Sequence, residues 1–509
     1  MVDPRTPVVV GVGQFTERID DPDYRGMSSV DLATEAVRAA LADTGVAPAA
    51  VAEAIEVFAG LRQFEICTPM PPPLGVSDNY VRSVARRVGA NPARAVLEPI
   101  GGNGPQKLMT EFAGEIAAGT IETALILGSE NGSTLKTFAN RPDSDKPDFT
   151  ERVGGQLEDR GYGYEQYMSE CTVKHGLTGA PVQYGLLDNA RRAKLGLGVD
   201  DYRRQMAELF APFSKVAAKN PFSASPVERS VDELATVTAE NRMICDPYPR
   251  LMVARDQVNQ GAAAVVMSVA AARRLGVPEG KWVYLRGHAD LVEQDLLLRA
   301  DLGTSVSAEL AVTEALRVAG IGLDDVATFD LYSCFPFPVF TVCDTMGLPA
   351  DDPRGLTLTG GLPFFGGPGN TYSLHGIAET VCEMREQPGK FGLVGANGGV
   401  MTKYSVGVYS TDPADWAADR SKELQAQIAA LPEVAVTRDV DTTGVIETYS
   451  VRYDWPENTG IIIGRLDGGS RFMATSTDAD LVALLSSGDP LGQRISVTAG
   501  DGTNQARLA

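Results

Sequence analysis

The sequence predicts an α/β protein built from two similar halves. Two glycine-rich turns carry this prediction, one at residues 101–104 and one at residues 366–370. Each turn leads into a helix with one apolar face and then into a buried strand, and the repeat of this strand–turn–helix–strand unit indicates a duplicated architecture. Strand and helix patterns also alternate over the first 130 residues, which predicts a mostly parallel sheet with helices on both faces.

Size and composition describe an ordinary globular chain. Its 509 residues suggest about three domains. The formal net charge of −21 argues against nucleic acid or an anionic membrane as a partner. The longest apolar stretch, residues 262–272, is too short to span a bilayer, and the first ten residues do not resemble a secretory signal. Six cysteines without a CxxC pair favour a reducing cytoplasm and no metal site.

The amino-terminal elements follow in order. A buried strand is expected at residues 7–15, a helix at 28–42, a strand at 54–59 and a helix at 78–88. In the first glycine unit, glycines allow the tight turn and Pro105 suits the first helical position. The helix that follows carries Leu108, Met109, Phe112 and Ile116 on one face. Its amino terminus offers backbone N–H groups to an anion, but the turn itself contains no nucleophile.

The composition of the sequence changes in the middle of the chain. Residues 131–255 are charged and punctuated by proline and glycine, which predicts a lid over a ligand site. A buried strand then leads into the second half, with a helix at 308–319, a strand at 327–332, the second glycine unit and a strand at 404–410. Beyond residue 415, a short helix precedes five β-rich runs, the first at residues 434–440, separated by turns. These runs predict a small appended antiparallel barrel.

Five segments in this order give the chain a family resemblance: VVVGVGQF, GGNGPQKLMTEFAGEIAAG, PRLMVARDQVNQGAAAVVMS, FDLYSCFP, and TGGLPFFGGPG with FGLVGANGGV. Over roughly residues 5–411 the chain resembles the thiolase superfamily, and within it the thiolase-like type 1 group related to sterol-carrier-type thiolases. The resemblance implies two five-layered halves, at residues 1–130 with 256–272 and at residues 282–414. A loop domain is then expected at residues 131–255 and the barrel at residues 415–509.

The resemblance also implies that thiolase side chains are missing. The acylated cysteine of the C-x-S-G motif matches Gly101 within Gly101–Gly104, and the histidine of G-H-P falls in Gly366–Pro368. The last C-x-G motif falls in Gly395–Gly399, and Tyr332 replaces the Asn or His of the N-E-A-F or H-D-C-F motif. Because glycine supplies neither a thiolate nor a base, we do not expect acyl transfer through a cysteine.

Three residues are candidates for other chemistry. Tyr332 ends a core strand and could exchange a proton with a substrate hydroxyl, or simply fill space. His375 lies one turn into the second helix, with Glu379 and Cys382 on the same face, and Tyr372 begins that helix. Candidate binding residues are the members of the two turns and of the last motif: Gly101, Asn103, Gly104, Gly367, Asn397 and Gly398. Helix capping explains Asn103 and Asn370 equally well.

Three functions remain open. The chain could bind acyl-CoA thioesters in lipid or sterol metabolism, resembling an acetyl-CoA acetyltransferase without its chemistry. It could cleave a β-hydroxyacyl-CoA by a retro-aldol reaction, as thiolase-like steroid side-chain aldolases do, with Tyr332 and Tyr372 as acid and base. It could also be a non-catalytic carrier or assembly subunit. Each function predicts coenzyme A thioester as ligand, no tightly bound cofactor, and a monomer or homodimer.

Overall fold

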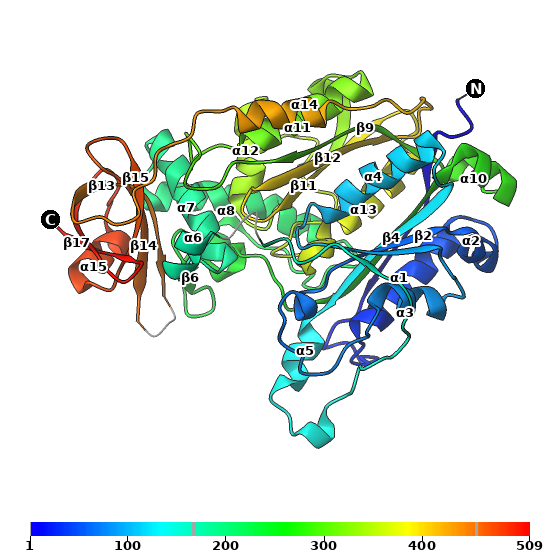
Figure 1. The fold of residues 1–509 in the computed structure, drawn as a ribbon, viewed down its shortest axis with the longest axis horizontal. Helices are drawn as coiled ribbons and strands as arrows, with labels where there is room; N and C mark the ends of the chain where they lie inside the picture. The colour runs from blue at the N-terminus through cyan, green and yellow to red at the C-terminus, as the bar shows by residue number, and fades with distance from the viewer. Residues whose placement is uncertain (1, 165–168, 454–456) are drawn as a thin grey trace.

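A computed structural model describes residues 2–164, 169–453 and 457–509 of the chain (Figure 1). Ten strands form one mixed sheet in the order β10-β11-β12-β9-β1-β8-β4-β2-β3-β5. The order β10-β11-β12-β9 mirrors β2-β4-β8-β1, so the two halves meet where β1 pairs with β9 at Val8 and Val9. The prediction of a duplicated α/β fold is therefore confirmed.

The amino-terminal half contains five strands and five α-helices. Its first 130 residues are the part of the sequence in which strands and helices were predicted to alternate. Ser28 caps α1, and its hydroxyl and the Asp31 carboxylate bond each other's backbone N–H groups in a capping box. Residues 48–54, close to the expected second strand, form a helix that begins at a proline. The elements are β1 (Pro7–Thr16), α1 (Ser29–Asp43), α2 (Pro48–Ala54), β2 (Val57–Leu61), α3 (Tyr80–Arg87), β3 (Arg94–Glu98), α4 (Gly104–Ala118), β4 (Thr123–Asn131), β8 (Asn259–Ser268) and α10 (Val269–Leu275).

The carboxyl-terminal half repeats the arrangement. Its second glycine turn leads into α13 as predicted, but residues 347–368 before the turn contain no strand, so the repeated unit is turn, helix and strand. The elements are β9 (Val283–Val292), α11 (Val306–Ala319), β10 (Val326–Leu331), α12 (Pro336–Met346), α13 (Tyr372–Glu386), β11 (Phe391–Gly398) and β12 (Lys403–Ser410).

The expectation of a mostly parallel sheet is wrong. Parallel pairs occur at the two ends of the sheet, β10–β11 on one side and β4–β2–β3–β5 on the other, whereas every pair between β11 and β4 is antiparallel. The four residues between β11 and β12 are too few for a crossover, so these strands must form a hairpin.

Helices cover the sheet on both faces, as predicted. α4 and α13 pack against each other in a central layer, where their apolar side chains meet Val9, Ile126 and Val394 of the strands. α1 and α3 cover the outer face of one half, and α11 covers that of the other (Figure 1). This arrangement places the amino termini of α4 and α13, with both glycine turns, close together.

The described residues of the predicted lid region form five α-helices and three short strands. Its short strand β5 adds to the edge of the main sheet by pairing in parallel with β3. The elements are α5 (Gly132–Ala139), β5 (Glu158–Asp159), α6 (Glu170–Lys174), α7 (Ala180–Leu195), α8 (Val199–Ala217), α9 (Val231–Ala235), β6 (Met243–Cys245) and β7 (Tyr248–Pro249).

Residues 442–508 form a closed five-stranded barrel, as predicted, in the order β13-β14-β15-β17-β16. The β15–β17 contact that closes it is parallel, and the others are antiparallel. The sequence missed β17 and α15, whereas residues 434–440 make only an isolated bridge. The elements are α14 (Ser421–Ala429), β13 (Thr442–Arg452), β14 (Thr459–Arg465), β15 (Arg471–Ser476), α15 (Ala479–Ser487), β16 (Arg494–Ala499) and β17 (Asn504–Leu508).

Within residues 2–164, 169–453 and 457–509, no helix has the length and apolar character needed to cross a membrane. In the same ranges, no three His, Cys, Asp or Glu side chains are grouped so that they could hold a metal ion.

Candidate functional site

A cavity of about 480 Å³ lies where the two glycine turns meet the lid. The segment after β10, the end of β11 and the start of α7 complete its wall. Of the described residues that line it, only Asp256 carries a charge. Of the predicted site residues, Gly101, Tyr332, Gly367 and Asn397 line this cavity, and Gly102, Cys334 and Asn370 lie beside them in its wall. The size and largely apolar lining are typical of small-molecule sites.

Asn370 ties the two turns together. Its side-chain oxygen accepts a hydrogen bond from the Gly101 N–H at 2.8 Å, and its amide nitrogen donates to the Arg62 carbonyl at 2.6 Å. Asn103 donates to the Ser405 hydroxyl at 3.2 Å. Neither asparagine side chain caps α4 or α13, so the helix-capping explanation is wrong for both. Both residues instead connect the amino-terminal half to the carboxyl-terminal half.

Tyr332 occupies the space beside Gly102. A Cβ atom at Gly102 would lie 2.6 Å from two ring carbons of Tyr332 and closer still to its hydroxyl. The ring also packs edge-on against Tyr372, with centroids 5.3 Å apart. Burial raises the pKa of the Tyr332 phenol well above its usual value, so the group is a neutral donor at pH 7. Its hydroxyl has no hydrogen-bond partner among the described residues.

Tyr372 and His375 lie beneath the cavity and do not line it. The Tyr372 hydroxyl shares a hydrogen bond of 2.6 Å with the Thr359 hydroxyl. The His375 Nδ1 atom lies 2.7 Å from the side-chain oxygen of Gln14, whose amide nitrogen donates to Glu379. Burial lowers the pKa of His375 to about 3, which keeps the ring neutral. The orientation of α13 therefore turns both side chains into the core.

The predicted binding residues divide between two cavities. Gly101, Gly367 and Asn397 line the main cavity. Asn103 and Gly104 line a second cavity of about 390 Å³ on the other side of the first turn. Gly398 lines neither of these two, and a Cβ atom there would meet the Asn103 side chain.

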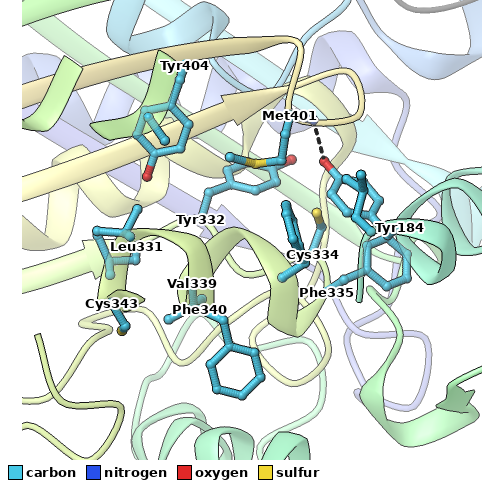
Figure 2. Close-up of a cluster of buried hydrophobic side chains, with 14 of the residues drawn as sticks. Tyr184, Leu331, Tyr332, Cys334, Phe335, Val339, Phe340, Cys343, Met401 and Tyr404 are labelled. Carbon is cyan, nitrogen blue, oxygen red and sulfur yellow. Dashed lines mark hydrogen bonds between the residues drawn. The ribbon is translucent and has the colours of Figure 1, made fainter. Parts of the chain in front are cut away.

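Tyr184, which sequence reasoning missed, forms a wall of the main cavity. Its hydroxyl donates to the Gly399 carbonyl at 2.9 Å and accepts bonds from Asn397 at 2.6 Å and from the Met401 N–H at 3.3 Å. Its ring stacks on Phe335 with centroids 4.7 Å apart. Figure 2 shows Tyr184 beside Cys334 and Phe335, with the bond to Met401 dashed. No local sequence motif around residue 184 indicates that it lines the cavity.

Two thiols face the cavity, but neither is ionised. Burial raises the pKa of Cys67 and that of Cys334 to about 12. The Cys67 thiol donates to the Gln63 carbonyl at 3.2 Å, and the Asn397 amide lies 3.9 Å from the Cys334 sulfur. Because the thiolate is the reactive form of cysteine, these residues are poor nucleophiles at neutral pH.

The duplicated halves, the paired glycine turns at one cavity and the inserted lid define a thiolase-fold protein with an additional barrel. The family described as thiolase-like protein type 1 additional C-terminal domain matches residues 423–503. The crystal structure of a monomeric SCP2-thiolase-like protein type 1 from Mycobacterium smegmatis is 62% identical. The alignment covers 100% of both chains with a TM-score of 0.87. The chain therefore belongs to the SCP2-thiolase-like protein type 1 family, which confirms the resemblance.

More distant structures show the fold alone. The Ltp2–ChsH2(DUF35) aldolase is 20% identical over 80% of this chain and 98% of its own, with a TM-score of 0.58. Human mitochondrial 3-ketoacyl-CoA thiolase is 16% identical over 81% of this chain and 100% of its own, with a TM-score of 0.56. No protein with a curated function matches the chain.

Proposed function

We propose that the main cavity binds the acyl end of a coenzyme A thioester without forming a covalent bond to it. The observation that carries this proposal is the neutral phenol of Tyr332, which faces the cavity beside Gly102 at the amino-terminal end of α4. A thioester carbonyl is an uncharged acceptor that such a donor suits. The described residues of the lining include no basic side chain, and the carboxylate of Asp256 is their single charge, so the charged phosphates of coenzyme A would remain outside the cavity.

Covalent acyl transfer finds little support in this geometry. Position 101 holds glycine, both cavity thiols have a raised pKa, and His375 lies in the core. A cysteine mechanism needs a thiolate and a base within hydrogen-bond reach. Binding of the thioester, as a carrier or as part of an assembly, is the function that the site supports best.

The second candidate is retro-aldol cleavage of a β-hydroxyacyl-CoA. In this reaction a base takes the β-hydroxyl proton, the bond between the α and β carbons breaks, and the electron pair forms a thioester enolate that is protonated at the α carbon. The unpartnered Tyr332 hydroxyl favours a role in stabilising that enolate. Tyr372 is hydrogen-bonded to Thr359 outside the cavity, so it does not supply the second group.

The deciding experiment is isothermal titration with coenzyme A, acetyl-CoA and a long-chain β-hydroxyacyl-CoA, with product analysis of the same mixtures. Binding without product supports a carrier, whereas formation of an aldehyde or ketone with a shortened acyl-CoA supports the lyase. If cleavage occurs, Tyr332→Phe should abolish turnover and retain binding. Failure of all three compounds to bind would refute the proposal.

We infer that the chain is a monomer in the cytoplasm. Thiolases usually dimerise through their core, but here β5 covers the edge of β3, with Val96 opposite Glu158 and Leu97 opposite Asp159. The Mycobacterium smegmatis relative is described as monomeric, and all six cysteines are free thiols. Light scattering would test the oligomeric state, and a mass twice that of the chain would contradict the inference.

A further inference from the structure

The helix α7 lies between the cavity and the barrel, and its two sides contact different partners. Ala180, Gln183 and Tyr184 line the cavity. Gly185 and Asn189 lie one turn apart and contact the barrel side. The α7 helix is thus the part of the cavity wall that is in direct contact with the carboxyl-terminal barrel.

Three successive residues of the barrel strand β13 form hydrogen bonds with the lid region, two of them with α7. The Thr448 hydroxyl donates to the Leu186 carbonyl at 2.5 Å, and the Asn189 amide donates to the Tyr449 carbonyl at 2.9 Å. The Ser450 hydroxyl donates to the Asp246 carbonyl at 2.8 Å, which holds the segment beside β6. These groups are buried, so the bonds of Thr448 and Tyr449 fix the position of α7 against β13.

Gly185 marks the closest approach of helix and barrel. A Cβ atom at this position would lie 2.7 Å from the Ser450 hydroxyl and closer still to the Asp246 carbonyl oxygen. The Asp246 oxygen belongs to the backbone, so it cannot move aside as a flexible side chain would. The neighbouring residue, Tyr184, is hydrogen-bonded to Gly399 and Asn397 and to Met401, the last of which Figure 2 shows.

We propose that the barrel acts as a positioning element, which holds α7 and thereby keeps Tyr184 closed over Cys334 in the cavity. Gly185, Thr448 and Asn189 are the residues that transmit this contact. This positioning role of the barrel is distinct from ligand binding and does not depend on which ligand the cavity takes. It assigns to the additional domain a function in shaping the site, although no barrel residue lines the cavity in the described ranges.

The test measures alkylation of Cys334 by iodoacetamide in the folded full-length protein, with mass spectrometry to resolve individual cysteines. Cys343 is the internal reference, because burial also raises its pKa to about 12 and it lies outside the cavity. The ratio of the two rates separates opening of the cavity from general loosening of the core. It requires no knowledge of the ligand.

Gly185→Ala should raise the ratio of Cys334 to Cys343 alkylation about threefold or more. The matched control is Gly464→Ala, whose Cβ atom would lie 2.7 Å from one carbon of the Phe472 ring inside the barrel and closer still to another, and which should lower stability without changing the ratio. Thr448→Val is the milder second variant, which removes one hydroxyl and keeps the side-chain shape. If neither Gly185→Ala nor Thr448→Val changes the ratio, or if Gly464→Ala changes it equally, the proposal is wrong.

Discussion

Gly102→Ala should destabilise the protein because Tyr332 already fills the space that a methyl group needs. The added Cβ atom would lie 2.6 Å from two carbons of the Tyr332 ring, which is well inside van der Waals contact. The ring cannot retreat freely, since Tyr372 packs edge-on against it at 5.3 Å and is itself fully buried. Overpacking of a well-packed core typically costs about 1–3 kcal/mol, and we expect a loss of this size.

Thermal unfolding measured by calorimetry would test this expectation, with Gly468→Ala as the control. No atom lies within 4 Å of the place that an added methyl group would take at Gly468, and this residue has no positive φ angle, so its substitution should leave the unfolding temperature nearly unchanged. The pair Gly102→Ala with Tyr332→Ala should be less destabilising than the sum of the two single changes, because the second removes the clash. Additive effects, or a Gly102→Ala protein as stable as the control, would refute the steric argument.

Other outcomes follow from the same structure. Gly101→Cys should yield no acetylated protein after incubation with acetyl-CoA, because residue 101 has a φ of 150°, the Asn103 side chain would crowd its Cβ at 2.5 Å, and His375 does not line the cavity; an acetyl group located at position 101 by mass spectrometry would contradict this. Burial lowers the pKa of His375 from 6.5 to about 3, so between these two pH values the unfolded chain binds a proton that the folded chain does not. The free energy of unfolding should therefore fall as the pH drops from 6.5 towards 3, by up to about 5 kcal/mol. His375→Asn keeps a donor for Gln14 but does not titrate, so its acid unfolding curve should be flatter over that range; an unchanged curve would show that other groups dominate. Arg471→Met should cost about 3 kcal/mol in calorimetry, because the buried guanidinium bonds the carbonyls of Leu297 and Arg299 and pairs with Glu447; a shift no larger than for Gly468→Ala would show that this contact contributes little.

Local sequence signals predicted the parts of the site that depend on local structure. The glycine turns, Pro105 at the start of α4 and the apolar faces of α4 and α13 lie where those signals placed them. The rotation of α13 about its own axis did not follow from the sequence, because it is set by contacts of His375 with Gln14 and of Tyr372 with Thr359. Tyr184 was missed for the same reason, since its partners Asn397 and Met401 lie more than 200 residues away.

The directions of the strands were likewise only partly predictable from local sequence patterns. Alternating strands and helices predicted parallel pairing, and β2 does pair in parallel with both β3 and β4. The antiparallel β8 enters the sheet between β1 and β4 only after the long lid region, so no local pattern fixes its direction. The sequence therefore predicted the composition of each half better than the order of its strands.

The family resemblance matches several glycines to thiolase catalytic motifs, and most of these glycines are packed against a polar neighbour. Tyr332 fills the space beside Gly102, and Asn103 lies where side chains at both Gly101 and Gly398 would project. The Tyr404 hydroxyl lies 2.5 Å from the Cβ position of Gly395. A side chain at Gly101, Gly102, Gly395 or Gly398 would thus clash with one of these neighbours, whereas a Cβ atom at Gly367 would lie 3.2 Å from the nearest neighbouring atom, the Arg255 carbonyl oxygen. The main cavity beside these glycines is the part of the site that is free to take a ligand.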